Sequence, residues 1–546
     1  MTNIQILILV TLILFGVKFL KDTLSFLWFF QIKEYRLDRM KSHVRGNSRV
    51  NFSDLSLVLG VFILLGLLFP ATARFIAVFF VLLLGGVAPL VFLYSFFQLI
   101  IGIKHRSFIR PKPTGKIVLI TVIYFMLFAV FVYFSISQLL QSVEIIYSAD
   151  FFILFAFYLL MLGILIPFFL LLAILIVTPI SNYQKNKIKA QSRLKMAGLK
   201  KVKTIGITGS FGKTSTKEFL YAILSQKFKV VKTSGNNNTD MGVANTILRD
   251  VNDDYDYFIC EMGAYRIGEI KATCSLALPF AGIVTGLNEQ HLDLFGSIEN
   301  TKRAKFELIH GLPKDGFAVI SEQAENMKPK SGYNVKDITI SSGNLAENVK
   351  VEPDAVEFEY KGTAFRVNIL GKHYIENLLS AIIVAEKLGM SLEQISEAVA
   401  KIAIKSSYLM QKQEGVKGAV FIDDHYSANP TGVVAALEYM EDAYPEYKKI
   451  LVFPGIDELG KNSKEIHQKI WKKTDDVCHF AFILQQEDKE IRKKYQKCHF
   501  VFEKDFDKMK KEVEKRLGAD SVVLFESRGA GVVMKKLLEN KDNKDA

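Results

Sequence analysis

Residues 203–218 read KTIGITGSFGKTSTKE, and this stretch decides the fold of everything that follows it. A short β-branched strand, 202–207, enters a glycine-bearing turn, and a helix begins near Lys213. Backbone N–H groups in such a turn point into one concavity, to which the helix N-terminus adds positive potential. Gly209 and Gly212 are needed there because a Cβ would keep the backbone away from a bound phosphate. The stretch therefore predicts a phosphate-binding loop that opens an α/β domain.

The residues of this loop have distinct expected tasks. Lys213 is expected to meet the β- and γ-phosphates of a nucleotide, and the hydroxyl of Thr214 is expected to bind Mg²⁺. The predicted nucleotide-binding residues of the loop are Gly209, Ser210, Gly212, Lys213, Thr214 and Ser215. The spacing fits the narrower pattern T-G-x-x-G-K-T better than the ordinary P-loop. The alternative is a glycine-bearing turn before a lysine-rich helix.

The long apolar runs of the chain are concentrated before residue 181. Five lie there, at residues 4–20, 55–69, 75–101, 117–140 and 151–180. The last three carry no charge and are long enough to cross a hydrocarbon core of about 30 Å, which predicts membrane spans. The second run ends early at Pro70, and the first is interrupted by Lys18, so a signal peptide is an alternative for the first. We predict an α-helical membrane region of about five helices over residues 1–180.

Basic residues indicate the orientation of these spans. The connections 31–52, 102–116 and 181–203 hold nineteen Lys and Arg against two acidic residues, whereas the two other connections are nearly bare. Five spans with the N-terminus outside place all three basic connections in the cytosol. The predicted location is the cell membrane, multi-pass, with the large C-terminal part cytosolic. The charge favours contact with anionic membrane lipids over binding of nucleic acid.

The four cysteines indicate a reduced compartment. They are Cys260, Cys274, Cys478 and Cys498, and no two of them stand at zinc-finger spacing. We therefore expect neither a disulfide framework nor a structural zinc site.

From residue 204 onward the pattern is that of an α/β protein. Short apolar strands alternate with helical stretches, which implies a parallel sheet with helices on both faces. The strand candidates after the phosphate loop are 229–232, 257–260, 282–285 and 318–320. Alternation within 336–370 predicts a small antiparallel appendage, and a helix follows over 374–388. The second series of strands is 418–422, 449–453, 480–484 and 522–525. We place a basic linker at 181–203, a central domain that contains the phosphate loop at 204–405 and a C-terminal domain at 406–546.

Polar side chains follow several of these strands, where open α/β sheets bind ligands. Asn238 follows one strand, Glu261 directly ends another, His291 comes soon after a third, and Lys305 lies in a helix. A glutamate, a histidine and the loop hydroxyl together suit a metal ion beside a nucleotide, although Mg²⁺ ordinarily prefers oxygen. Each residue also has a simpler explanation: Glu261 as a helix cap, His291 as a hydrogen-bonded turn residue, and Lys305 as a solvated helix charge.

From Lys203 to the C-terminus, the chain resembles the Mur ligase family, and most closely its D-alanyl-D-alanine-adding member. The resemblance rests on TGSFGKTSTKE, SGNNNTDMGV, CEMGAYRIGEI, EQHLDLFGSIENTKRAK, LGKHYIENLLSAI, FIDDHYSANPTGVVAAL, DELGKNSKEIH and FESRGAGVV, in the family's order. It implies a P-loop central domain and a Rossmann-like C-terminal domain. It also implies an ATP-dependent acid–amino acid ligase, ADP-forming, that acts through an acyl phosphate in peptidoglycan or related cell-wall precursor synthesis.

The same resemblance implies roles for individual residues. Lys213, His291 and Lys305 would be catalytic, with Lys213 on the phosphates and Lys305 carbamylated by CO₂. Two magnesium ions would be held by Thr214, Glu261, His291 and the carbamate of Lys305. Asn377 would contact adenine, and Asn238 would lie at the nucleotide. Asp423, Asn429 and Arg528 would position the incoming amino acid or dipeptide, and the acceptor would be a muropeptide-like acid linked to a nucleotide or a lipid.

The chain also departs from the family pattern. His373-Tyr374 stands where His-Asn is expected, Ser407-Tyr408 stands where a Gly-Arg pair is expected, and Pro454-Gly455 replaces Gly-Asp. The apolar region stands in place of the family's N-terminal domain for the uridine nucleotide. Two other functions stay open: an amidating or polyamide-forming ligase acting on another acceptor, and a membrane sensor that binds ATP without making bonds.

Overall fold

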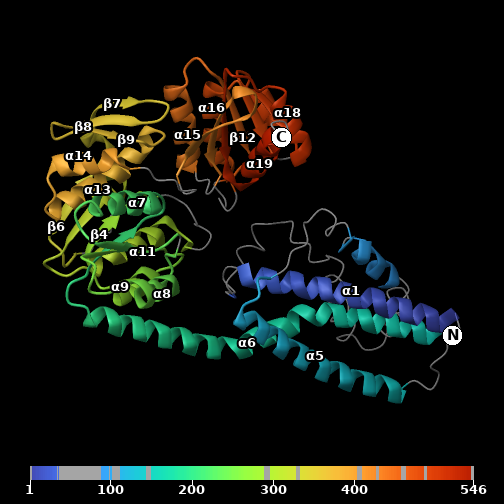
Figure 1. Ribbon diagram of the computed structural model, residues 1–546. Helices are drawn as coiled ribbons and strands as arrows, with labels where there is room; N and C mark the ends of the chain where they lie inside the picture. The colour runs from blue at the N-terminus through green and yellow to red at the C-terminus, as the bar shows by residue number, and fades with distance from the viewer. Residues whose placement is uncertain are drawn as a thin grey trace. The chain divides into compact units, whose positions relative to one another are not determined.

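The computed structural model describes residues 3–32, 35, 88–97, 99–100, 111–142, 149–235, 237–287, 295–326, 332–402, 409–425, 430–456, 463–484 and 489–542. The chain divides into two compact units, 1–186 and 187–546, which are considered separately below (Figure 1).

The first unit is built from apolar helices, most of them long. They are α1 (Asn3–Ile32), a short helix at Ala88–Phe97, α5 (Gly115–Ser142) and the greater part of α6 (Ala149–Gly198). Two stretches, Gly115–Ser137 and Phe155–Gly198, are long and apolar enough to cross a membrane by length and composition, with mean hydropathies of 2.8 and 3.1.

These helices cover the predicted spans unequally. The runs 117–140 and 151–180 fall in α5 and α6, and the run 4–20 falls in α1. The run 55–69 lies outside the described residues, as does most of 75–101. The basic segment predicted as a linker, 181–203, is helical as far as Gly198.

The second unit contains a six-stranded parallel sheet around the phosphate loop. Its strand order is β2-β3-β1-β4-β5-β6, and its strands are β1 (Lys203–Thr208), β2 (Val230–Lys232), β3 (Tyr257–Glu261), β4 (Pro279–Val284), β5 (Phe317–Ser321) and β6 (Asp337–Ser341). Successive side chains of a strand point to opposite faces, so Ile259 joins one core while Phe258 and Cys260 join the other.

Helices cover both faces of this sheet, as predicted (Figure 1). The helices α7 (Lys213–Leu224) and α13 (Ile375–Lys387) pack in the first core, and α8 (Asp240–Asp250), α9 (Glu269–Ala277) and α11 (Ile298–His310) pack in the second. Two further helices are α12 (Glu322–Glu325) and α14 (Leu392–Ala400).

The predicted antiparallel appendage is smaller than expected. Only β7 (Glu347–Val351), β8 (Val356–Tyr360) and β9 (Thr363–Val367) form it. The strand before them, β6, pairs in parallel with β5 and extends the main sheet instead. The predicted range, 336–370, therefore began too early, because a sequence alone does not identify the partner of a short strand such as β6.

A second sheet follows, with the order β10-β11-β15-β12-β13-β14. Its strands are β10 (Gln411–Glu414), β11 (Val420–Asp424), β12 (Lys448–Phe453), β13 (Phe480–Ile483), β14 (His499–Phe502) and β15 (Ser521–Glu526), and only β10 runs antiparallel to its neighbour. Its helices are α15 (Pro430–Ala443), α16 (Ser463–Val477), α17 (Lys489–Lys494), α18 (Phe506–Glu514) and α19 (Ser527–Asp542). Both β10 and β14 were missed from the sequence; β10, QKQE, contains no apolar residue, so no hydrophobic pattern marks it.

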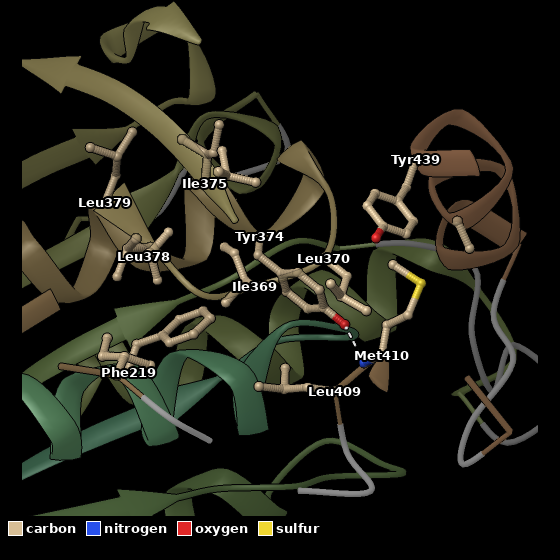
Figure 2. Close-up of a cluster of buried hydrophobic side chains, with 14 of the residues drawn as sticks. Phe219, Ile369, Leu370, Tyr374, Ile375, Leu378, Leu379, Leu409, Met410 and Tyr439 are labelled. Atoms are coloured by element: carbon tan, nitrogen blue, oxygen red, sulfur yellow. Dashed lines mark hydrogen bonds between the residues drawn. The ribbon is translucent and has the colours of Figure 1, made fainter. Parts of the chain in front are cut away.

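One hydrophobic core joins the two sheets' domains, and Tyr374 lies within it (Figure 2). The hydroxyl of Tyr374 accepts a hydrogen bond from the backbone N–H of Met410 at 3.1 Å, just before β10. On the other side of the core, the hydroxyl of Tyr439 on α15 donates to the backbone carbonyl of Pro353 at 2.8 Å. Residues far apart in the sequence thereby hold the two domains together.

Candidate active site

A cavity of about 500 Å³ lies at the carboxyl ends of the central strands. The phosphate loop forms one wall, and Glu261, Lys305 and the start of α13 form others. The second domain closes it with Asp424 and the first turns of α15. The predicted residues that line it are Gly209, Ser210, Gly212, Lys213, Thr214, Ser215, Asn238, Glu261, Lys305 and Asn377.

The shape of the phosphate loop requires its two glycines. Gly209 has φ 154°, and a Cβ there would lie 2.0 Å from Oγ1 of Thr285. Gly212 has φ 78°, and a Cβ there would lie 2.3 Å from Oδ1 of Asn377. The loop is anchored to the sheet because the N–H of Ser210 donates to the carbonyl of Gly286 at 2.8 Å. The prediction that these glycines give the backbone close access to the cavity is consistent with this geometry.

Lys213 begins α7 at the floor of the loop. Its ammonium donates to the carbonyl oxygens of Gly209 and Ser210 at 2.8 and 2.9 Å. Burial lowers the pKa of Lys213, and the nearby carboxylate of Glu261 partly offsets that effect. No side chain caps the N-terminus of α7, so its first N–H groups and the lysine together provide positive potential for an anion.

Glu261, at the end of β3, is the centre of a hydrogen-bonded cluster. Its side chain is 1% exposed. The hydroxyl of Thr214 donates to its Oε2 at 3.1 Å, and the amide of Asn238 donates to its Oε1 at 3.0 Å. Nζ of Lys217 lies 3.0 Å from the same Oε2. Thr214, Asn238 and Glu261 were predicted from the sequence to lie at one site, whereas Lys217 was missed because it looked like one more lysine on a lysine-rich helix.

Lys305, on α11, is not a solvated helix charge. Its side chain is buried, and Nζ donates to the backbone carbonyl of Ala264 at 3.3 Å. Nζ also lies 5.5 Å from the ring centroid of Phe295. Burial lowers the pKa of Lys305 well below its usual value, and the positive charge of Lys213 lowers it further. The alternative interpretation of Lys305 as a solvated helix charge is therefore wrong.

Two acidic residues of the second domain meet beside the cavity. Asp424 and Glu526 are paired neighbours at the carboxyl ends of the parallel strands β11 and β15. Asp424 lines the cavity, whereas Oε2 of Glu526 is buried and has no partner among the described residues. Burial raises the pKa of Asp424 to about 6 and raises that of Glu526 well above its usual value. Burial in the folded protein thus opposes ionisation of both carboxyls.

The predicted residues for the amine substrate are placed unevenly. Asp423 does not line the cavity; its Oδ1 accepts from the backbone N–H of His425 at 3.2 Å and contacts the His425 ring. Asp424 lines the cavity instead, because neighbouring residues of a strand face opposite sides. Arg528 is exposed in the first turn of α19 and is not part of the lining. His291 and Asn429 lie outside the described residues, as does the Ser407-Tyr408 pair.

The donor set fits a magnesium nucleotide better than a metal site made of protein alone. Within the described ranges, no group of three or more His, Cys, Asp and Glu side chains gathers around a common point. The carboxylate of Glu261 and the hydroxyl of Thr214 are neighbours on the cavity wall. Because Mg²⁺ takes few protein oxygens and completes its coordination with phosphates and water, such a pair suits it beside the phosphate loop.

Comparison with known proteins agrees with this geometry. Residues 207–385 match the Mur ligase middle domain, and residues 410–529 match the Mur ligase glutamate ligase domain. The UDP-N-acetylmuramoyl-tripeptide–D-alanyl-D-alanine ligases of Escherichia coli and Bacillus subtilis are 32% and 30% identical, over 49% of this chain in each case. The matched part spans only 61% and 59% of those relatives.

Comparison with solved structures also gives the Mur ligase fold. The MurF ligase of Thermotoga maritima, in complex with ADP, is 25% identical and superposes with a TM-score of 0.58, covering 66% of this chain and 85% of that chain. A MurF from Acinetobacter baumannii shares the fold with a TM-score of 0.57 at 23% identity. Through its middle and C-terminal domains, the chain belongs to the Mur ligase family.

Proposed function

We propose that this protein is an ATP-dependent, ADP-forming ligase that joins an acid to an amino acid or dipeptide through an acyl phosphate. The observation that supports it most strongly is that one cavity brings together the phosphate loop, Glu261 and Lys305. A binding-only sensor would need the loop but would have no use for a buried lysine facing it. The relatives named above add the chemistry: they ligate D-alanyl-D-alanine to a muramoyl tripeptide linked to UDP.

The residues of the chain would divide the work of the reaction. Lys213 and the N-terminus of α7 would bind the phosphates and neutralise charge that develops on them. Thr214 and Glu261 would hold Mg²⁺, which supplies charge neutralisation at the transferred phosphoryl group. Asn377, which contacts the loop at Gly212, would fix the nucleoside side of ATP. Removal of water by the surrounding walls strengthens all these interactions.

We further propose that Lys305 works as a carbamate. An amine attacks CO₂ only in its neutral form, and burial beside Lys213 favours that form. Carbamylation would turn a buried cation into an anionic oxygen ligand, which a magnesium ion accepts far better than an amine. The same change would remove the repulsion between the two lysines.

The substrates are proposed from the relatives and from the apolar helices. The acceptor would be a muropeptide-like acid on UDP, as in the relatives' names, or the same acid on a membrane lipid. Helices in the first unit that are long and apolar enough to cross a membrane support the second form. We propose a multi-pass protein of the cell membrane with the N-terminus outside and the ligase domains in the cytosol, where confinement would raise the effective concentration of a lipid-linked acceptor.

Release of ADP tests the reaction. Full-length protein with ATP and Mg²⁺ would be offered UDP-linked muramoyl tripeptide and a polyprenyl-linked form of the same muropeptide, each with D-alanyl-D-alanine, with ammonia and without an amine. We expect ADP release only when both acid and amine are present, and none from the Lys213→Ala variant. Release with ammonia alone would favour an amidating ligase, and no release with any acceptor would favour a sensor.

The same assay decides between the two forms of acceptor. With protein in lipid nanodiscs, the membrane proposal expects a higher kcat/KM for the polyprenyl-linked acceptor than for the UDP-linked one. An equal or lower value would mean that the apolar helices only anchor an enzyme of soluble precursors.

A further inference from the structure

Lys217 is a buried cation that the proposed reaction does not yet use. It lies one helical turn after Lys213 on α7, and its side chain is completely buried. Its Nζ donates to the carbonyl of Gly235 at 2.6 Å and lies 3.0 Å from Oε2 of Glu261. An ammonium taken out of water is tolerated only when charge and hydrogen bonds compensate it, and Glu261 is its closest anion.

The carboxylate of Glu261 therefore stands between a fixed cation and the cavity. Glu261 lines the cavity and Lys217 does not, so the lysine contacts the carboxylate from the protein side. The other oxygen of Glu261, Oε1, is held by the amide of Asn238, and the hydroxyl of Thr214 contacts both oxygens. Three donors thus fix the orientation of a group that would otherwise rotate.

We propose that Lys217 is a positioning residue that serves as the internal counter-ion of Glu261, compensating this buried carboxylate from the protein side and weakening its hold on Mg²⁺. This inference rests on the proposed metal role of Glu261. A buried carboxylate is tolerated only when charge and hydrogen bonds compensate it, and Lys217 supplies the cation from the protein side. A divalent ion arriving on the cavity side meets the repulsion of the ammonium behind the carboxylate, so the ion remains exchangeable.

Binding of Mn²⁺, as a spectroscopic substitute for Mg²⁺, tests whether the charge of Lys217 weakens metal binding at Glu261. Free Mn²⁺ would be measured by electron paramagnetic resonance at pH 8 in titrations of full-length protein with saturating ADP. We expect Glu261→Gln to weaken Mn²⁺ binding at least tenfold and Lys217→Met to tighten it at least fivefold. The matched control is Lys361→Met, which removes the exposed pair with Glu386 and should leave Mn²⁺ binding unchanged.

The possible outcomes separate this inference from the function on which it rests. If Glu261→Gln binds Mn²⁺ as the parent does, the proposed metal role of Glu261 is wrong. If Glu261→Gln weakens binding and Lys217→Met leaves it unchanged or weakens it too, the metal role stands and the counter-ion role of Lys217 is overturned.

Thermal unfolding gives a second readout that does not depend on turnover. In buffer with a chelator, Lys217→Met should melt below the parent, and Mn²⁺ with ADP should raise its Tm by more than it raises the parent's. The double variant Lys217→Met/Glu261→Gln buries neither charge alone, so it should melt above Lys217→Met and respond little to Mn²⁺. If the double variant is as unstable as Lys217→Met, or does not fold, the lysine acts through packing and the inference fails.

Discussion

Replacing Asp424 by Asn should stabilise the C-terminal domain at neutral pH while it impairs the site. Asp424 lies between the cavity and Glu526, and burial raises its pKa from 3.8 to about 6. A raised pKa of this kind reflects a cost of ionisation, because the folded protein holds the proton more tightly than the unfolded chain does. An amide of the same shape carries no charge and avoids that cost.

The magnitude follows from the pKa difference. A change from 3.8 to about 6 corresponds to about 3 kcal/mol for a fully shielded group. Since the side chain faces the cavity and is partly accessible, we expect about 1–2 kcal/mol. Between pH 3.8 and about 6 the folded state binds more protons than the unfolded state, so the cost grows as pH rises through this window and is complete above it. The gain from Asp424→Asn should therefore be largest above pH 7 and almost absent near pH 4.

Fluorescence of Trp471 reports the unfolding of the C-terminal domain, which also contains Asp424. Trp471 is buried on α16 against the ring of Phe453, and replacing Trp28 by Phe would leave it as the only tryptophan. Urea unfolding of full-length protein would be followed at pH 4.5, 6 and 8 (about 1.5 to 2 units apart, spanning the titration). Asp520→Asn, at a carboxylate that is 72% exposed, is the control and should change the free energy of unfolding by less than about 0.5 kcal/mol.

A loss of stability on Asp424→Asn that is the same at pH 4.5 and pH 8 would refute this reasoning. It would mean that the ionised carboxylate makes favourable contacts that outweigh its burial. Glu526→Gln offers a second check, since an amide there can donate to Asp424 and should move the pH dependence of stability towards lower pH.

Three further outcomes are expected. Gly212→Ala should lower ATP turnover at least tenfold, because its Cβ would press on Oδ1 of Asn377 and the alanine would have to keep a φ of 78°; unchanged ADP release would contradict the role of the loop. Lys305→Ala should be nearly inactive but partly restored by added short carboxylic acids. If Lys305 were only a solvated helix charge, Lys305→Ala would release ADP as fast as the parent. Tyr374→Phe should cost about 1–3 kcal/mol in urea unfolding, because the buried N–H of Met410 loses its acceptor; an unchanged midpoint would show that this hydrogen bond does not matter.

Sequence reasoning located the phosphate loop and the order of most strands because these depend on local patterns. The β-branched residues of β1 and the glycines of the loop prescribe a strand, a turn and a helix within sixteen residues, 203–218. The polar strand β10 could not be found in this way, since its existence depends on pairing with β11. Local sequence patterns therefore predict most helices and strands, whereas strands such as β10 form only through pairing with a distant segment.

The site shows the same division. Thr214 and Glu261 follow recognisable strand ends, so their neighbourhood was predictable. Lys217 was not, because only the tertiary structure shows that this one lysine of α7 is completely buried. The choice between Asp423 and Asp424 depended on which face of β11 meets the cavity, and a sequence of two adjacent carboxylates does not contain that information.

The polar end of α6 has a consequence for attempts to release the ligase domains by proteolysis. Residues 187–198 belong to the second unit, where Met196 packs in a core and Lys195 donates to the carbonyl of Leu248 at 2.9 Å. Lys189 forms an ion pair with Asp240 at the start of α8. Trypsin cleavage near residue 200 would thus produce a fragment with an uncovered apolar patch over α8, prone to aggregate. Cleavage after Lys185 would keep the covering helix and should yield the soluble, crystallisable piece.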